Sequence, residues 1–329
     1  AAPNNEAVAT PTGVTPERWK SLTHPEDGHV TAPRALLQSI VGGVHATLRK
    51  DCWKLLLRQY DFKQSMAGRR ERDTQVQSAY EALKTEWKLA ALSDAPADAE
   101  KLAAFLEHCN TIDQDVSRSD FHDDGGNEFS CNLRSILRTY VYHNLDRGYA
   151  QGMLDLLEPL LFVIDDEASA YYCFSNLMLR CGPRFDRDAD HGIEGYLSKL
   201  RSLVAYDDIE LYERIVCLDA DHFFFAYRWF LLDFKREFGK EAILQLWEAL
   251  WAIEALHNEH FVVFVALEHL RGHRAEIMRC RNSTDVMRVF NAFARVCGGQ
   301  DAAGIVSRSL ATIERIKSEL LARGVVCEK

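Results

Sequence analysis

Residues 111–121, TIDQDVSRSDF, place a carboxylate three residues before a guanidinium, at Asp115 and Arg118. A guanidinium is always charged and presents several donors to anionic oxygens. On a helix or helical turn the two side chains are neighbours, so the acid could orient the guanidinium. Acid and arginine at this spacing are also common on surface helices. Taken alone, the pattern indicates an ordinary exposed pair.

A second segment, residues 148–153 (GYAQGM), carries Gln151 between Gly148 and Gly152 without apolar periodicity. A side-chain amide both donates and accepts hydrogen bonds, so it can hold a water molecule without carrying charge. Glycines on either side allow the backbone to turn sharply and to approach another molecule closely. Taken alone, this segment is typical of a turn between two helices.

Other residue patterns predict neither a metal site nor a bound cofactor. His257 and His260 could ligate a metal, but no third ligand is in view. The acidic stretch at residues 122–128 lacks the ligand pattern of a calcium loop. The nine cysteines are widely spaced without a CxxC pair, so we expect reduced thiols in a cytosolic protein. No GxxxxGK[ST] loop is present, so the chain is not expected to bind a nucleotide in that manner.

The charge and the apolar content disfavour binding to nucleic acid and insertion into a membrane. A formal net charge of -10 disfavours an electrostatic grip on nucleic acid or on an anionic membrane surface. The longest apolar runs, residues 153–164 and 222–234, contain charged residues and are shorter than the roughly 18 apolar residues of a membrane span. The chain begins with Ala1 rather than Met, so further domains outside this sequence are to be expected.

Helical periodicity recurs along the chain, whereas we find no convincing strand alternation. The clearest case is residues 133–141, in which apolar side chains recur at i, i+3, i+4, i+7 and i+8. Phe223, Tyr227, Phe230 and Phe234 form a bulky stripe that we expect in the core. The sequence therefore predicts an all-α fold.

The two polar segments are far more specific together than apart. Ile112, Asp115 and Arg118 follow the pattern I-x-x-D-x-x-R, and residues 149–153 follow Y-x-Q-G-M. In this order they match the two signature motifs of a known family. The chain resembles the TBC-domain GTPase-activating proteins for Rab GTPases.

The segments around the two motifs extend the resemblance from about Thr15 to about Leu270. Gly42, Gly43, Arg49 and Trp53 are similar to a further family motif, and YRWFLLDFKREF is similar to a distal block. The chain departs from the family after Arg118, where the family often has R-T-x-P and this sequence has Ser119 and Asp120. Serine keeps the hydroxyl of threonine, whereas the loss of proline is expected to loosen the loop.

The resemblance implies a single TBC domain of two packed helical subdomains. We expect residues 1–14 to be a flexible linker, because they are rich in Ala, Pro, Asn and Thr. Residues 15–182 are expected to form the first subdomain, which carries both motifs, and residues 183–329 the second. The break near residues 181–190 is the predicted boundary.

The resemblance also implies roles for individual residues. Arg118 is the expected arginine finger and Gln151 the expected glutamine finger, both acting in trans on the nucleotide site of a Rab. Asp115, Tyr149 and Gly152 are expected to support them.

Arg49 and Trp53 are the other expected supporting residues. Arg49 could brace the finger region or touch the Rab, and Trp53 could be a core residue or a partner contact.

The implied activity is GTPase activation on a GTP-bound Rab, without turnover of a substrate of its own. GTP and Mg²⁺ would belong to the partner, so no cofactor and no metal of this chain are expected. The implied setting is cytoplasmic, with recruitment to endomembranes in vesicle trafficking by peripheral association rather than membrane insertion. The alternative is a catalytically silent helical module that binds a Rab as a scaffold or effector.

Overall fold

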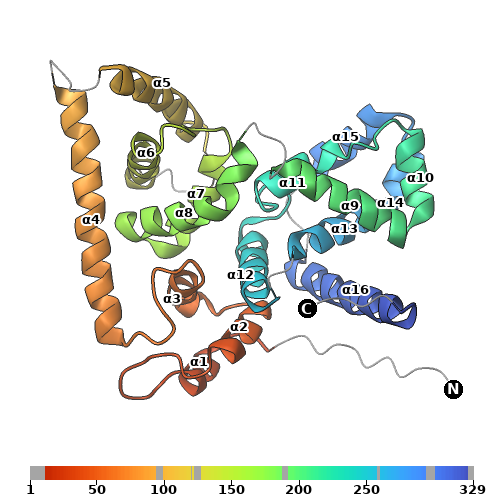
Figure 1. Cartoon of the computed structure of the whole chain (residues 1–329), viewed down its shortest axis with the longest axis horizontal. Coiled ribbons are helices and arrows are strands. Elements are labelled where there is room, and N and C mark those ends of the chain that lie inside the picture. Colours follow the sequence, from red (N-terminus) through yellow and green to blue (C-terminus); the bar gives the residue numbers. More distant parts are fainter. Residues whose placement is uncertain are drawn as a thin grey trace. The chain divides into compact units, whose positions relative to one another are not determined.

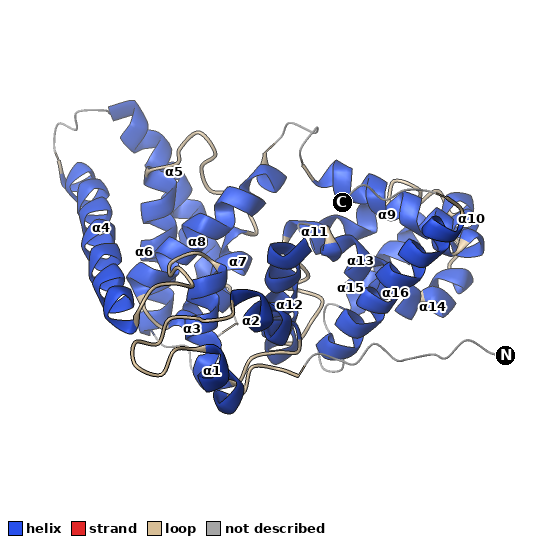
Figure 2. Cartoon of the chain, turned by 60° about the horizontal axis from the view of Figure 1, so that its bottom comes forward, coloured by secondary structure: helices blue, strands red, loops and turns tan. Residues whose placement is uncertain are grey.

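The computed structural model describes residues 12–93, 99–119, 121, 127–186, 192–257, 260–293 and 301–324. Within these ranges the secondary structure is helical, and β-type pairing is confined to two isolated bridges, Val14 with Val44 and Thr23 with Val30 (Figure 2). The prediction of an all-α fold is confirmed. Most of the expected linker, Asp120 and most of the acidic stretch 122–128 lie outside the described residues.

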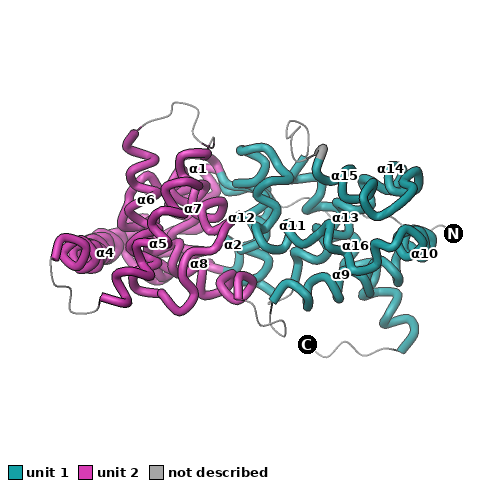
Figure 3. Tube along the Cα trace, turned by 90° about the horizontal axis from the view of Figure 1, so that it is seen from above, with its two compact units in different colours: residues 1–14, 34–44, 189–329 teal, residues 15–33, 45–188 magenta. Residues whose placement is uncertain are grey.

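The chain forms two compact units, which Figure 3 shows in different colours. As far as their residues are described, unit 2 comprises Thr15–Pro33 and His45–Asp188, and unit 1 comprises Ala1–Val14, Arg34–Val44 and Ala189–Lys329. The segment 34–44 is thus separated along the chain from most of its own unit. The predicted halves, 15–182 and 183–329, are each one continuous stretch of chain, so the prediction does not assign segment 34–44 to the later unit.

Unit 2 contains the long helix α4 and the central helix α7 (Figure 1). The sequence of α7, MLDLLEPLLFVI, is apolar except for Asp155 and Glu158, as expected of a helix enclosed by others. It packs against α3, α5, α6 and α8, and only Phe162 and Val163 of its residues are not buried. The described helices of this unit are α1 (Pro16–Leu22), α3 (Ala46–Leu56), α4 (Met66–Leu92), α5 (Ala99–Val116), α6 (Asn127–Tyr142), α7 (Met153–Ile164), α8 (Glu167–Cys181) and the 3₁₀ helix η1 (Gly182–Phe185).

In helix α6 the apolar residues that recur along the sequence form one buried face. Its side chains at 133, 136, 137, 140 and 141 are all buried, as the periodicity predicts. This face contacts α5, α7 and α8. Fully burying a single leucine or isoleucine side chain contributes about 1.5–3 kcal/mol, so such a face holds the helix in place.

Unit 1 is organised around α13, which packs against α9, α12, α14 and α16. The early segment 34–44 belongs to this unit, and the backbone N–H of Val44 donates to Oε2 of the fully buried Glu248 at 3.1 Å. The described helices are α2 (Pro33–Val41), α9 (Ile193–Asp207), α10 (Ile209–Cys217), η3 (Phe224–Ala226), α11 (Tyr227–Leu231), α12 (Lys240–His257), α13 (Phe261–Gly272), α14 (Arg274–Arg279), α15 (Ser283–Phe293) and α16 (Ala302–Ala322).

The aromatic stripe at residues 223–234 is only partly a core stripe. Phe223, Phe230 and Phe234 are buried, whereas Tyr227 is 45% exposed. The segment is not one continuous helix, because the backbone of Phe223 has a φ of 56° and α11 ends at Leu231. The expectation that Tyr227 belongs to the core is therefore wrong.

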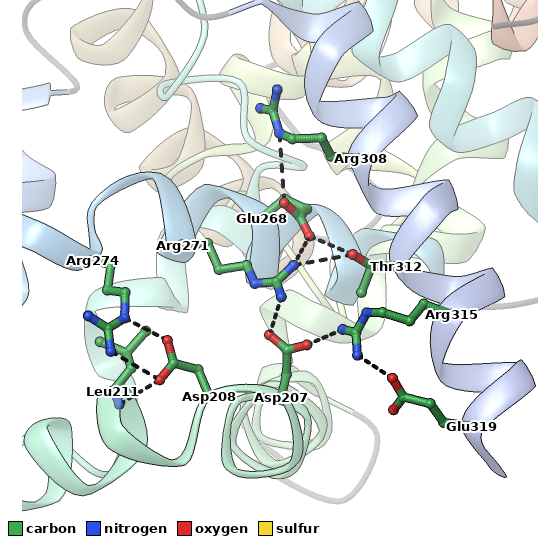
Figure 4. A network of polar contacts seen from close by, with 10 residues as sticks. All are labelled: Asp207, Asp208, Leu211, Glu268, Arg271, Arg274, Arg308, Thr312, Arg315 and Glu319. Atoms are coloured by element: carbon green, nitrogen blue, oxygen red, sulfur yellow. Dashed lines mark hydrogen bonds and ion pairs between the residues drawn. The ribbon is translucent and has the colours of Figure 1, made fainter. Parts of the chain in front are cut away.

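A network of ion pairs joins three helices of unit 1 (Figure 4). The Asp207 side chain, at the end of α9, is fully buried and lies between Arg271 of α13 and Arg315 of α16. Its Oδ2 lies 2.7 Å from Nη2 of Arg271. The Arg271 guanidinium also reaches Oε1 of Glu268, which accepts from the Thr312 hydroxyl at 2.8 Å. This network connects the C-terminal end of α9 to α13, which packs against it, and to α16.

We expect Asp207→Asn to lower the free energy of unfolding by about 1–3 kcal/mol, because one guanidinium group loses its acceptor oxygen and both lose the opposite charge. This decrease in the free energy of unfolding should be smaller than that caused by breaking a fully buried ion pair, since the side chains of Arg271 and Arg315 are 33% and 42% exposed. Urea unfolding followed by circular dichroism measures the change. Hydrogen exchange should locate it in α9, α13 and α16.

The matched control is Glu314→Gln on α16, whose side chain is 65% exposed and lies 3.9 Å from Lys317. An Asp207→Asn midpoint no lower than that of this control would contradict a stabilising role for the network.

Candidate functional site

Arg118 lies two residues beyond the end of α5 and is exposed. The backbone closes a tight turn there, because the N–H of Arg118 donates to the carbonyl of Asp115 at 3.0 Å and that of Ser119 to the carbonyl of Val116 at 3.2 Å. Among the described residues, the Arg118 guanidinium has no hydrogen-bond partner. The expected contact of this guanidinium with the Asp115 carboxylate, both of which are described, is not formed.

Gln151 lies in the connection between α6 and α7, one residue before the N-cap of α7. Its side chain is exposed and, within the described part of the chain, makes no hydrogen bond. Gly148 has a φ of 65°, and a Cβ there would lie 2.4 Å from Nε2 of His108. Gly152, the N-cap itself, has a φ of 107°. Both glycines are therefore required by the backbone path that presents Gln151 to solvent.

The two segments are joined by a partly buried hydrogen bond. The hydroxyl of Tyr149 donates to Oδ2 of Asp115 at 2.8 Å, and Tyr149 itself is 8% exposed. Burial, together with this bond to a carboxylate, raises the pKa of Tyr149 well above its ordinary value. The bond lies three residues from Arg118 and two from Gln151. Asp115 and Tyr149 thus connect the segments that carry the two exposed side chains.

Helix α7 holds the loop after Arg118 at two points. The hydroxyl of Ser119 donates to Oε1 of Glu158, and the ring of Phe121 packs edge-on against Phe162 with centroids 5.9 Å apart. Glu158 and Phe162 are one helical turn apart on α7. The loop that was expected to be loosened by the missing proline is thus attached to the central helix of unit 2.

An ion pair holds the middle of the α6–α7 connection. Arg147 donates from Nε and Nη2 to the two carboxylate oxygens of Asp186, at 2.8 and 2.9 Å. These bonds hold the pKa of the Asp186 carboxyl below its ordinary value. The pair is partly exposed, so its role is to orient the connection more than to stabilise the fold.

Arg49 and Trp53 lie on α3, which packs against α7. Trp53 is fully buried, which fits the first of its two expected roles, a core residue. Arg49 is only 9% exposed. Both residues are therefore placed to support the interior of unit 2 beneath its surface.

Glu158, His108 and Phe121 belong to this site but match neither of the two motifs. Glu158 carried a detectable signal, because a carboxylate in the apolar run LLEPLL needs a donor once the run is buried. His108 and Phe121 carry no such signal, since their contacts depend on how α5 packs against the α6–α7 connection and how the residues after α5 pack against α7. Together these residues contact the segments that carry the exposed guanidinium of Arg118 and the exposed amide of Gln151.

The family model described as the Rab-GTPase-TBC domain matches residues 46–278, more than half of the chain. Small G protein signaling modulator 2 of Mus musculus is 40% identical over 211 residues, which cover 62% of this chain and 20% of that protein. Rab GTPase-activating protein tbc-8 of Caenorhabditis elegans is 40% identical over 200 residues, which cover 59% of this chain and 22% of that protein. The chain thus spans about a fifth of the length of these curated relatives.

Among solved structures, the crystal structure of the Ypt/Rab-GAP domain of Gyp1p superimposes with a TM-score of 0.72. The match covers 90% of this chain and 95% of that domain at 17% sequence identity. At this identity the similarity is one of fold, and it agrees with the helical architecture described above.

We expect Tyr149→Phe to lower the free energy of unfolding by about 1–3 kcal/mol at neutral pH, because Asp115 loses its buried donor. Folded Tyr149 keeps its proton above the ordinary pKa of 10.0, whereas the unfolded chain releases it. The wild-type advantage is therefore complete below pH 10 and shrinks as the pH rises further. Urea midpoints of both proteins between pH 7 and pH 11 measure this difference.

Tyr227→Phe serves as the matched control, since Tyr227 is 45% exposed. A Tyr149→Phe deficit equal to that of Tyr227→Phe, or one that does not change with pH, would contradict a stabilising hydrogen bond to Asp115.

Proposed function

The chain belongs to the Rab-GTPase-TBC domain family, and from this membership we propose that it accelerates GTP hydrolysis by a GTP-bound Rab GTPase. The observation that supports the proposal most directly is the state of two side chains. Arg118 and Gln151 are exposed and lack hydrogen-bond partners among the described residues, while the segments that carry them are joined by the bond between Tyr149 and Asp115. Side chains of this kind are available to a second molecule.

Arg118 is proposed to neutralise charge in the nucleotide site of the Rab. Negative charge on the phosphoryl oxygens must be stabilised in the transition state of GTP hydrolysis. A guanidinium donates several hydrogen bonds at once and stays charged at any physiological pH. In GTPase activation in general, an arginine supplied in trans contributes roughly 10³–10⁵ in rate, which corresponds to about 4–7 kcal/mol of barrier.

Gln151 is proposed to position the attacking water. An amide can accept a hydrogen bond from the water and donate one to an oxygen of the Rab without adding charge. In small GTPases this task is commonly assigned to a glutamine of the GTPase itself. With Gln151 in the same position, the activating protein would supply both catalytic groups, and GTP and Mg²⁺ would remain bound to the Rab.

The surrounding contacts are proposed to keep the two side chains in place before the Rab arrives. The bond between Tyr149 and Asp115 fixes the distance between the segments, and the bond between Ser119 and Glu158 restrains the backbone next to Arg118. A catalytic group that is already oriented loses less entropy when the complex forms. Gly152 lets the backbone beside Gln151 approach the partner closely.

The proposed partner also fits the bulk properties of the chain. In the described residues, no helix has the length and apolar content needed to cross a lipid bilayer. We propose that association with endomembranes, and a role in vesicle trafficking from the cytoplasm, come through the Rab or through domains outside this sequence. The net charge of -10 favours a partner surface of opposite sign.

We expect Arg118→Ala to reduce stimulated GTP hydrolysis by roughly 10³-fold and Gln151→Ala to remove most of it, because each deletes a group that acts in the transition state. Phosphate release in single turnover, screened across a panel of GTP-loaded Rabs, measures the effect. Circular dichroism should show both variants folded, since both side chains are exposed.

The matched controls are Arg70→Ala and Gln75→Ala, both at exposed positions on α4. Stimulation by either finger variant equal to that of its control would contradict the assigned role. Binding of GTP-loaded Rabs without any increase in phosphate release by the parent protein would instead favour the silent scaffold.

A second prediction separates the two groups. If Gln151 positions the water, a Rab whose own switch glutamine is replaced by alanine remains a substrate, because the missing amide is supplied in trans. The measurement is stimulated hydrolysis by that Rab variant beside its parent, with binding checked separately. Intact binding with complete loss of stimulation would contradict the role of Gln151 and leave Arg118 as the only group acting in trans.

A further inference from the structure

The turn between α1 and α2 brings three metal-ligating side chains together in unit 2. His24, Asp27 and His29 each offer one ligand atom, and these atoms lie within 4.8 Å of one another. Nδ1 of His29 lies 2.6 Å from Oδ1 of Asp27, and Nδ1 of His24 lies 3.2 Å from the same oxygen. This is the one group of its kind found among the described residues, and it precedes the family match at residues 46–278.

The backbone forms this arrangement without a ligand. An antiparallel bridge pairs Thr23 with Val30, and the N–H of His24 donates to the carbonyl of His29 at 2.8 Å. The two imidazoles therefore lie opposite each other, stacked with centroids 4.9 Å apart. The hairpin places Asp27 within reach of both rings.

The tip of the turn is held by the first residue of α4, Met66. The N–H of Met66 donates to the carbonyl of Asp27 at 2.7 Å. Gly28 has a φ of 74°, and a Cβ there would lie 2.5 Å from Cγ of Met66. The three side chains are thus carried by a backbone that contacts outside the turn keep in place, so little ordering remains to be done when a ligand binds.

One atom of the cluster lacks a partner. Nδ1 of His24 is buried and, among the described residues, has no hydrogen bond, although Oδ1 of Asp27 is 3.2 Å away. Asp27 already accepts from the backbone N–H of His29 at 3.2 Å and lies against the His29 ring. A buried ring nitrogen that faces a carboxylate without a hydrogen bond is a favourable position for a cation between the two.

From these contacts we propose that His24, Asp27 and His29 bind a divalent transition-metal ion, with Zn²⁺ as the best match. Two imidazole nitrogens and one carboxylate oxygen are typical zinc ligands, whereas Ca²⁺ and Mg²⁺ take oxygen ligands. Bonds of about 2.0–2.1 Å in a tetrahedral site place ligand atoms about 3.3 Å apart, so shifts of about 1 Å complete the site. Water fills the fourth position, since the His24, Asp27 and His29 side chains are 40%, 49% and 32% exposed.

This proposal departs from the expectation that the chain has no metal site, and it does not depend on the proposed action on a Rab. The ion would displace the proton between His29 and Asp27 and fasten the turn between α1 and α2. Its test needs neither GTP nor a partner, so its failure leaves the proposed function untouched.

The experiment is calorimetric titration of the metal-free chain with ZnCl₂, followed by Co²⁺ as a spectroscopic probe. We expect one bound Zn²⁺ per chain, and a Co²⁺ spectrum with tetrahedral visible bands but without thiolate charge-transfer absorption. His24→Gln and Asp27→Asn should each weaken binding at least about tenfold. The matched control, His222→Gln, removes another exposed imidazole and should leave the affinity unchanged.

A measurement on the parent chain keeps the test independent of the variants. On addition of Zn²⁺, the ring-proton resonances of His24 and His29 should shift together in the NMR spectrum. The proposal is overturned by equal affinity of His24→Gln and the parent, by thiolate absorption with Co²⁺, or by unshifted resonances of the two rings. In each of these cases the cluster is a hydrogen-bonded pair of Asp27 and His29 with His24 stacked beside it.

Discussion

A carboxylate enclosed in a helical core must be met by hydrogen-bond donors, and this constraint shapes unit 2. Glu158 lies on α7, the helix that the unit encloses, and is 3% exposed. Ser119 supplies one donor, so the chain after α5 has to pass close to α7. Asp115, which is partly buried, likewise accepts a hydrogen bond from the hydroxyl of Tyr149. The hydrogen bonds that these two carboxylates accept therefore hold the residues after α5 and the α6–α7 connection in place.

The residues that hold the site together and the residues assigned to chemistry differ in their exposure to solvent. Asp115, Tyr149, Ser119 and Glu158 are at least partly buried and bonded to one another in pairs, whereas the two side chains assigned to chemistry are exposed. A long cationic side chain and an amide lose conformational entropy when they are ordered, and here that loss is deferred until a partner arrives. The surrounding pairs reduce it by fixing the backbone on either side. The backbone of the site is therefore held by hydrogen bonds, whereas the side chains of Arg118 and Gln151 are exposed.

Local patterns were enough to predict the helical class, because apolar spacing at 3.6 residues per turn records which face of α6 is buried. Two short motifs were enough to single out Arg118 and Gln151, whose roles stay predictions. The contacts that hold them were out of reach, since they join residues 34 and 39 positions apart and arise only when α5, α6 and α7 pack. The prediction that Tyr227 is buried is wrong for a related reason. The positive φ of Phe223 interrupts the helix, and the spacing of apolar residues does not reveal such an interruption.

The segment 34–44 has a consequence for how the chain is made. Leu36 and Ile40 of α2 are completely buried, and the unit that contains them takes most of its residues from position 189 onward. A ribosome that adds about 5–20 residues per second would leave this apolar face without its partners for roughly ten to thirty seconds. During co-translational folding α2 is therefore a natural target for chaperones. Each unit is built from separate stretches of the chain, so neither unit can be expressed as one continuous fragment.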